Sequence, residues 1–300
     1  PLAPFKVCAD GSDVSVFTWD HDAAVSHTHL PLRIKEDPGH TMADRYGEMA
    51  AQIEESSTPE RIAFRYRHPR LPPPTGVPFE HVTLQVYDET TGAVLAAHAL
   101  QIYRAPVVLV HGWTGDYSSM EGLHQGLLGS GMWPGTLVLN FDYYLASARS
   151  FYDNRNVVPN RISQELAICR AAGFAAGRTE VIGHSMGGIL ARLYLQSSWG
   201  ANSAYRGDIF RLITVDTPHS GSQGANFLQE IEASSGLCGS VLFYPRQVIH
   251  FLEGHWGLPG ALTGAAVTNL AVDGAGIRSA LGGASLNRSI VPTRTEVGES

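Results

Sequence analysis

A serine between two glycines, where a strand-like run passes into a helix-like run, constrains this chain more than any other feature. Residues 181–188 read Val-Ile-Gly-His-Ser-Met-Gly-Gly, and Gly183–Gly187 matches the pattern G-x-S-x-G. A β-branched pair precedes the motif, and the helix-forming run 189–196 follows it. A turn this tight strains the serine backbone, so the residues two positions away must be small. The pattern therefore predicts a strand–turn–helix unit with Ser185 at its apex.

This turn has a chemical consequence for the serine. It lifts the serine Oγ above the edge of the sheet and places the N–H of Met186 at the helix N-terminus, where a developing negative charge is favoured. The alternative is a chance match, because the chain contains 32 glycines. The strand before the motif, the helix after it and a second motif upstream favour Ser185 as a nucleophile.

The second motif is the segment 105–115, Ala-Pro-Val-Val-Leu-Val-His-Gly-Trp-Thr-Gly. Its apolar run ends at His111 and predicts a strand buried on both faces, as in a parallel sheet. An acyl-transfer site needs two backbone N–H donors directed at the oxygen of the tetrahedral intermediate. We assign these donors to Met186 and Trp113. The alternative is an ordinary strand-ending turn. We expect His111 to anchor the loop through hydrogen bonds and not to act as the catalytic base.

These two motifs and a third, Thr-Pro-His-Ser-Gly-Ser at residues 217–222, resemble the α/β-hydrolase superfamily. Within it they are most similar to bacterial lipases and GPI inositol-deacylase-like lipases, and the resemblance covers residues 102–300. It implies a doubly wound, mostly parallel sheet, serine esterase or lipase activity and no cofactor. It also implies a catalytic triad in the chain order nucleophile, acid, histidine, in which Ser185 and the two backbone donors carry over directly.

The acid and the histidine of such a triad are harder to place. The histidines after Ser185 are His219, His250 and His255. The resemblance gives His219 a structural role, and the other two fall in a region expected to form a cap. We therefore expect the acid and the histidine beyond residue 300, with Asp216 as the fallback acid and His255 or His250 as the fallback base. The alternative for Asp216 is a structural role in its own turn.

An alternation of strands and helices from about residue 105 predicts a parallel, doubly wound sheet. We expect strands at 107–110, 136–141 and 209–215, helices at 118–129 and 161–176, and a further core strand starting within 290–297. Residues 223–290 interrupt this alternation. They predict a cap or lid over the site, with ordinary core-covering helices as the alternative.

Residues 1–101 lack this alternation and predict a small β-rich module, with a sandwich as one possible form, ahead of a hydrolase domain at 102–300. Strand-like runs occupy 14–19, 62–66, 81–87, 93–100 and 101–103, and residues 88–92 form a hairpin turn. Prolines in 71–78 exclude a central strand there. His27 and His29 would share one face of a strand. Without further ligands at metal-site spacing, we expect surface histidines and no metal.

Composition excludes several classes of partner. The net charge is -7, and no basic block favours nucleic acid. No apolar stretch reaches the ~18 residues of a transmembrane span. The sequence begins without methionine, so we expect a secreted protein after removal of a signal, or a shortened chain. Cys169 reads as a buried thiol, and a bridge between Cys8 and Cys238 is an open alternative.

The sequence thus predicts a serine hydrolase that cleaves small-molecule or lipid carboxylic esters through an acyl-enzyme on Ser185. An acyltransferase or an amidase of the same fold is one alternative. A non-catalytic, hydrolase-like binding module that contacts a polymer or a partner protein is another. The intact motif around Ser185 argues against the binding module, because binding does not require a strained turn.

Overall fold

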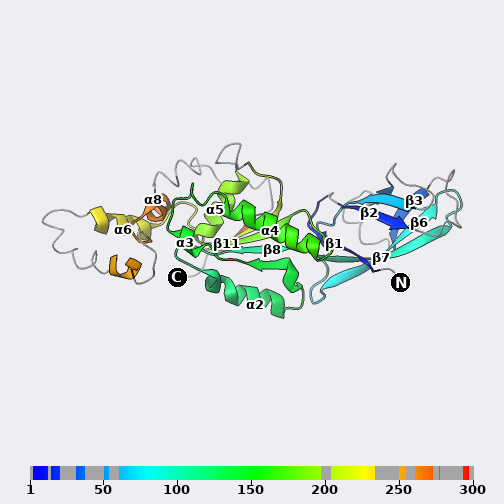
Figure 1. Ribbon diagram of the computed structural model, residues 1–300, viewed down its shortest axis with the longest axis horizontal. Coiled ribbons are helices and arrows are strands. Elements are labelled where there is room, and N and C mark those ends of the chain that lie inside the picture. Colours follow the sequence, from blue (N-terminus) through cyan, green and yellow to red (C-terminus); the bar gives the residue numbers. More distant parts are fainter. Residues whose placement is uncertain are drawn as a thin grey trace. The chain divides into compact units, whose positions relative to one another are not determined.

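The computed structural model describes residues 3–12, 15–20, 32–37, 51–53, 61–196, 204–233, 250–254, 261–272, 277 and 293–296 (Figure 1). Its internal contacts divide the chain into two compact units. Unit 1 comprises Pro1–Pro106, Gly126–Val138 and Glu165–Thr179, and unit 2 comprises Val107–Gln125, Leu139–Gln164 and Glu180–Ser300. The predicted domain division after residue 101 stays a prediction. The sequence did not predict that the later segments Gly126–Val138 and Glu165–Thr179 belong to unit 1.

Unit 1 is built from two β-sheets. One has the strand order β10-β1-β7-β6-β3 and the other the order β2-β5-β4. The strands are β1 (Phe5–Ala9), β2 (Ser15–Asp20), β3 (Leu32–Asp37), β4 (Ala51–Ile53), β5 (Arg61–Tyr66), β6 (Phe79–Asp88), β7 (Val94–Arg104) and β10 (Phe174–Ala175). Side chains from both sheets share one core, because Phe64 and Tyr66 of β5 pack with apolar residues of β1, β6 and β7. The expected β-rich part is therefore a two-layer β structure.

The longest pairing in unit 1 is the antiparallel hairpin of β6 and β7. Buried residues alternate along β6 at Val82, Leu84 and Val86, which is the pattern of a strand with one face in a core. The predicted hairpin turn at residues 88–92 follows β6. Asp88 accepts hydrogen bonds from the Thr90 N–H and the Thr91 hydroxyl. The two runs predicted at 93–100 and 101–103 are one continuous strand.

A buried polar cluster closes unit 1 around the carboxylate of Asp10. Its Oδ1 accepts hydrogen bonds from the Ser12 N–H at 3.0 Å, the Ser12 hydroxyl at 2.6 Å and the His68 Nδ1 at 3.0 Å. Its Oδ2 accepts from the N–H groups of Gly177 at 2.7 Å and Arg178 at 3.0 Å. Three segments far apart along the sequence are therefore joined at one side chain.

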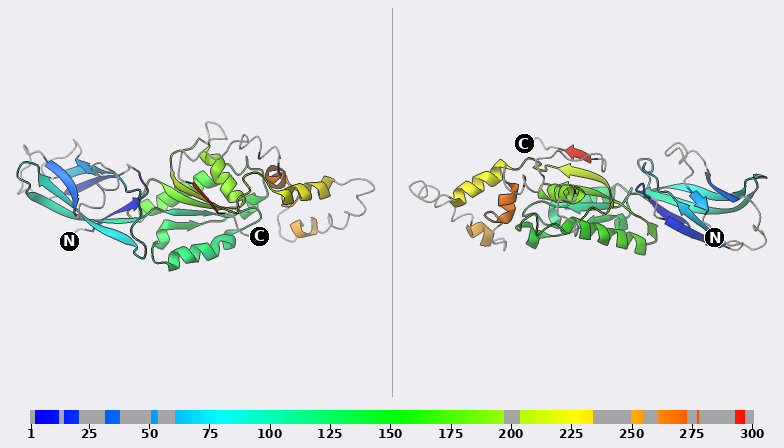
Figure 2. Two further views of the ribbon diagram at one scale, coloured as in Figure 1. Left: turned by 180° about the vertical axis from the view of Figure 1, so that it is seen from behind. Right: turned by 90° about the horizontal axis from the view of Figure 1, so that it is seen from above.

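Unit 2 is built on a sheet of strand order β13-β12-β11-β8-β9, with parallel pairing of β11 with β8 and of β12 with β13. The strands are β8 (Val107–Val110), β9 (Val138–Asn140), β11 (Thr179–His184), β12 (Ile209–Val215) and β13 (Thr293–Glu296). Helix α5 (Met186–Leu195) lies on one side of the sheet and α2 (Glu121–Gly129) on the other (Figures 1 and 2). This is the doubly wound arrangement that the sequence predicts.

Two predicted elements have different bounds in the structure. The helix expected at 161–176 is α4 (Val157–Ala171), because a proline such as Pro159 is tolerated in the first turn of a helix. The helix ends before Gly173, which has φ 83°, and the residues after it form β10 beside β1. The strand expected at 136–141 is shortened to β9, because Gly135–Leu137 form a 3-10 turn (η2). A second 3-10 turn, η1 (Tyr117–Met120), opens the predicted helix that continues as α2.

The described part of the region predicted as a cap is mainly helical. It contains α6 (Gln223–Ala233), a helical segment at 250–254 and α8 (Ala265–Leu270). The apolar run at 237–243 and His255 lie outside the described residues, as do the histidines at 27 and 29 and Cys238. Cys8 and Cys169 are buried free thiols. Among the helices described, none has the length and apolar character needed to cross a bilayer.

We predict that Asp10→Asn destabilises the protein by about 1–3 kcal/mol or more, the cost of leaving buried hydrogen-bond donors without an acceptor. The new side-chain amide can be oriented in two ways, and in both its NH2 group faces N–H or O–H donors on one side of the cluster. Two donors cannot form a hydrogen bond with each other. Urea unfolding at neutral pH measures the loss. Glu230→Gln, at an exposed position of α6, is the matched control and should change stability by less than about 0.5 kcal/mol. Equal stability of Asp10→Asn and the wild type would contradict the prediction.

The same cluster predicts a pH dependence. Burial raises the pKa of the Asp10 carboxyl, but the hydrogen bond and charge of His68 and the hydrogen bonds from Ser12 and Gly177 outweigh it, so the pKa lies below its ordinary value. A carboxyl with a lowered pKa stabilises the fold above its unfolded-state pKa and loses that contribution as the pH falls through the folded-state value. The stability gap between the wild type and Asp10→Asn should therefore narrow in acid.

Candidate active site

Ser185 lies at the junction of β11 and α5, where the sequence predicts it. Its φ of 52° and ψ of -124° lie outside the regions that ordinary L-residues favour. Two backbone hydrogen bonds hold this conformation: the Ser185 N–H donates to the Val215 carbonyl at 2.9 Å, and the Gly188 N–H donates to the Ser185 carbonyl at 3.1 Å. The strained serine is therefore anchored both to β12 and to the first turn of α5.

The glycines around Ser185 allow α5 to fold back onto the sheet. A Cβ on Gly183 would lie 2.6 Å from the backbone of Gly188, so the strand and the helix touch through their main chains. A Cβ on Gly187 would lie 2.5 Å from the carbonyl oxygens of Val110 and His111 at the end of β8. Larger residues at these positions would force the strands and the helix apart.

The third sequence motif packs on the same helix. A Cβ on Gly188 would collide with the side chain of Thr217. The Thr217 hydroxyl also donates to the carbonyl oxygens of Gly183 at 3.4 Å and Val215 at 3.3 Å. The threonine of the Thr-Pro-His segment thus locks the loop after β12 against the turn that carries Ser185.

The loop after β8 lies directly beside the serine. A Cβ on Gly112 would lie 2.7 Å from the Cβ and 3.2 Å from the Oγ of Ser185, so only glycine fits there. The loop then turns back, with Thr114 at φ 54° and the Gly115 N–H donating to the Gly112 carbonyl at 3.2 Å. The peptide between Gly112 and Trp113 is therefore next to the Ser185 hydroxyl.

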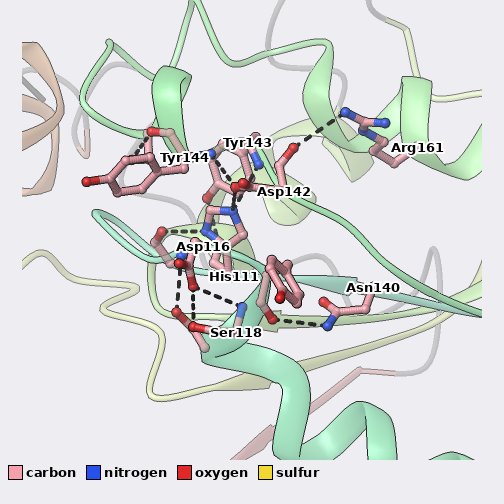
Figure 3. A network of polar contacts seen from close by, with 12 residues as sticks. His111, Asp116, Ser118, Asn140, Asp142, Tyr143, Tyr144 and Arg161 are labelled. Atoms are coloured by element: carbon pink, nitrogen blue, oxygen red, sulfur yellow. Dashed lines mark hydrogen bonds and ion pairs between the residues drawn. The ribbon is translucent and has the colours of Figure 1, made fainter. Parts of the chain in front are cut away.

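His111 holds this loop in place through the hydrogen bonds of its ring, as Figure 3 shows. Its ring is buried. The Nδ1 atom lies 2.9 Å from the Gly112 carbonyl oxygen, and the Nε2 atom lies 3.0 Å from the Tyr143 backbone nitrogen. The ring stacks on Tyr143 at a centroid distance of 4.1 Å, and the Tyr143 hydroxyl donates to the His111 carbonyl at 2.7 Å. His111 is a hydrogen-bonded anchor of the loop, as expected from its position before the serine.

The loop after β9 supplies the other side of this network. Asp142 accepts the Tyr144 N–H at 2.7 Å and lies 3.2 Å from the His111 Nε2. It shapes its own loop. Sequence reasoning missed Tyr143, whose stacking on His111 joins residues that no local pattern connects.

A chain of contacts links Trp113 to the predicted cap region. The Trp113 indole Nε1 donates to the Ala261 carbonyl at 2.7 Å. The N–H groups of the next two residues, Leu262 and Thr263, donate to the buried carboxylate of Glu253 at 2.7 and 2.9 Å. The loop beside the serine is thereby tied to residues 261–263.

The structure gives the two described histidines after Ser185 other partners. The His219 ring accepts from Arg192 at 3.3 Å and lies 3.2 Å from the Thr214 hydroxyl. Burial and then the Arg192 charge lower the pKa of His219 to about 4, in agreement with its expected structural role. The His250 ring nitrogens face Glu232 at 3.3 Å and Glu253 at 3.4 Å.

The catalytic base and acid therefore stay predictions. Within the described part of the chain, no histidine is hydrogen-bonded to the Ser185 Oγ. Asp216 stands at the end of β12 with φ 47° and an exposed side chain, which suits either an acid or a turn residue. The described residues also hold no group of three or more His, Cys, Asp or Glu side chains arranged for a metal ion.

Comparison with known proteins agrees with this arrangement. Residues 106–252, just under half of the chain, match the family model of palmitoyl protein thioesterase. This segment contains the serine motif and the Thr-Pro-His motif in full, and the second motif from Pro106 onward. The match and the sheet order place this part of the chain among the α/β-hydrolases, the superfamily that includes thioesterases, lipases and esterases. The predicted fold class is confirmed.

Solved structures show weaker likenesses. The mature lipase BlEst2 of Bacillus licheniformis is 18% identical with a TM-score of 0.39, and the match covers 64% of each chain. Phospholipase PlaB of Legionella pneumophila is 15% identical with a TM-score of 0.41, over 65% of this chain and 39% of that one. An inhibited esterase B of Lactobacillus rhamnosis is 14% identical with a TM-score of 0.36, over 85% and 79%.

The close packing at Gly187 predicts that Gly187→Ala destabilises the protein by about 1–3 kcal/mol or more, because the new methyl group meets backbone oxygens that cannot rotate away. Gly122→Ala is the matched control. Gly122 lies within α2 with open space around its Cβ position, so this variant should be stabilised by about 0.5–1 kcal/mol. Urea unfolding measures both changes, and a neutral effect at Gly187 would contradict the packing described above.

Proposed function

We propose that the protein is a serine hydrolase that cleaves carboxylic esters through an acyl-enzyme on Ser185. The observation that carries this proposal is the strained Ser185 backbone, at φ 52°, with Gly112 packed against the side chain. Residues held in such sparsely populated conformations cost about 1–3 kcal/mol and cluster at functional sites. A purely structural serine at this junction would gain nothing from that strain.

The reaction would proceed in two steps. The Ser185 Oγ attacks the carbonyl carbon of the ester, its proton passes to a general base, and a tetrahedral oxyanion forms. Collapse of this intermediate breaks the bond to the leaving alcohol, which receives the proton, and leaves the acyl group on Ser185. Water then attacks the acyl-enzyme in the same way and releases the acid.

The oxyanion would be held by the N–H groups of Trp113 and Met186. Met186 is the first residue of α5, a helix of ten residues whose N-terminus favours negative charge. Trp113 follows Gly112, the residue that packs against the Ser185 side chain. Removal of one such donor in a serine hydrolase lowers kcat by about 10²–10³.

For the base, we expect an acid and a histidine beyond residue 300, as the resemblance implies, with Asp216 and His255 or His250 as the fallback. Carboxylates already lie beside both ring nitrogens of His250, which leaves neither nitrogen for the serine and favours His255 over His250. Activity that survives His255→Ala would point to a base elsewhere in the protein.

A thioester is the second candidate substrate, and the observation that favours it is the match of residues 106–252 to the palmitoyl protein thioesterase family. The same serine chemistry serves both substrates. A thiol, with a pKa of about 8.5, also leaves more readily than an alkyl alcohol. The proposed oxyanion donors act on the carbonyl oxygen, which the two substrates share.

The serine assignment predicts that Ser185→Ala removes hydrolysis of p-nitrophenyl butyrate by about 10⁶-fold, as triad knockouts do. It should also abolish labelling by a fluorophosphonate probe, with the wild-type adduct located on Ser185 by mass spectrometry. Ser163→Ala, at an exposed position of α4, is the matched control and should keep both properties. Near-wild-type turnover by a folded Ser185→Ala protein would contradict the proposal. An unlabelled wild type would favour the binding module.

The substrate class is tested by one matched pair, the butanoyl thioester of N-acetylcysteamine and the corresponding oxygen ester. The two differ only in the leaving atom. We expect the thioester to be hydrolysed with the higher kcat/KM, and both reactions to disappear in Ser185→Ala. A clear preference for the oxygen ester would discard the thioester candidate and leave the esterase. Transfer of the acyl group to added amines or alcohols would instead indicate the acyltransferase.

A further inference from the structure

The hydrogen bonds around His111 define the protonation state of its ring. Nε2 faces the Tyr143 backbone N–H at 3.0 Å, which can only donate, and the Asp142 carboxylate at 3.2 Å, which can only accept. The Gly112 carbonyl can only accept, so the Nδ1 atom at 2.9 Å must carry the proton. Burial lowers the pKa of His111 and keeps the ring neutral, so its one proton is on Nδ1 and Nε2 accepts from the Tyr143 N–H. The two other titratable groups that act on the ring are Asp142 and Asp116.

The tautomer matters because of the peptide that it holds. The Gly112 carbonyl receives the Nδ1–H of His111 and the N–H of Gly115 at 3.2 Å. In a trans peptide the C=O and the following N–H point in opposite directions. Two hydrogen bonds on the Gly112 carbonyl consequently fix the direction of the Trp113 N–H. This is the peptide that lies beside the Ser185 Oγ.

The clamp on the ring itself is rigid. His111 is completely buried, stacks on Tyr143 at an interplanar angle of 15° and receives the Tyr143 hydroxyl on its own carbonyl. The same His111 carbonyl lies against Gly187 in the first turn of α5. The stacking and the ring hydrogen bonds therefore hold the side chain in one orientation, and the backbone of His111 is held at the contact between β8 and α5.

We propose that His111 is a positioning residue for the proposed reaction: its Nδ1–H orients the Gly112–Trp113 peptide so that the Trp113 N–H meets the oxyanion. This inference rests on the proposed function. It goes beyond the loop anchor described above, because it assigns the two ring nitrogens different roles. Nδ1 acts on catalysis through the peptide, whereas Nε2 acts on loop structure through Tyr143.

Two substitutions separate these roles. In His111→Asn the amide nitrogen takes the place of Nδ1 and keeps a donor for the Gly112 carbonyl, but the acceptor for Tyr143 is lost. In His111→Gln the amide oxygen takes the place of Nε2 and keeps that acceptor, but the donor is lost. Both variants lose the stacked ring, so each serves as the control for the other.

For ester hydrolysis we expect His111→Gln to lower kcat by about 10²–10³, the effect of losing an oxyanion donor, with KM little changed. His111→Asn should lose clearly less kcat than His111→Gln, because it keeps the donor to the Gly112 carbonyl. A trifluoromethyl ketone, which forms a tetrahedral oxyanion on the serine, should lose affinity for the Gln variant in proportion to kcat/KM. A role confined to loop structure predicts equal losses in the two variants, or the greater loss in the Asn variant, and either result overturns the proposal.

One measurement does not depend on whether the variants fold. Nitrogen-15 chemical shifts of the His111 ring in the wild-type protein at neutral pH should report a neutral imidazole protonated at Nδ1. A ring protonated at Nε2, or at both nitrogens, would overturn the inference. If Ser185→Ala keeps full activity, the proposed function fails instead, and the His111 variants are then not needed to decide it.

Discussion

The close approach of two backbones at Gly187 is the contact on which the candidate site depends. A Cβ atom on Gly187 would lie only 2.5 Å from the carbonyl oxygens of Val110 and His111 at the end of β8. All ten residues of α5 are buried, so the helix has no freedom to tilt away. The strand, the helix and the loop beside Ser185 are consequently positioned by van der Waals contact between main chains, with no side chain between them.

This packing explains how an unfavourable serine conformation persists. A residue at φ 52° is strained unless its surroundings leave it no alternative. Here β12 accepts the N–H of Ser185, the first turn of α5 donates to its carbonyl, and Thr217 closes the remaining space above Gly188. The strain is stored where the proposed chemistry needs an accessible hydroxyl above the helix N-terminus.

The loops around the serine are held by buried polar groups with defined partners. His111 connects the end of β8 to the residues after β9, and the Trp113 indole connects the same loop to Ala261. Glu253 in turn receives the N–H groups that follow Ala261. A polar group buried without a partner costs about 1–3 kcal/mol, so each of these contacts restricts the loop to one arrangement. The position of the proposed oxyanion donor is thus a property of several loops together.

Features carried by adjacent residues could be predicted from the sequence alone. The strand Ile209–Val215, the hairpin turn after β6 and the strand–serine–helix unit follow from apolar patterning, turn residues and the steric needs of a tight turn. The placement of Gly112 beside Ser185 also follows, because parallel strands end at the same edge of a sheet. These rules act over a few adjacent residues, so they can be applied to the sequence without a structure.

The tertiary structure alone decided the contacts between residues far apart along the chain. The pairing of β10 with β1, the meeting of Asp10 with Gly177 and the stacking of Tyr143 on His111 have no periodic or spacing signal. Each is specified by which surfaces remain to be covered once the sheets have formed. The partners of His219 and His250 belong to the same class. A histidine becomes a base, an anchor or a bridge through the groups that packing brings to its ring, and its type and place in the sequence do not contain that information.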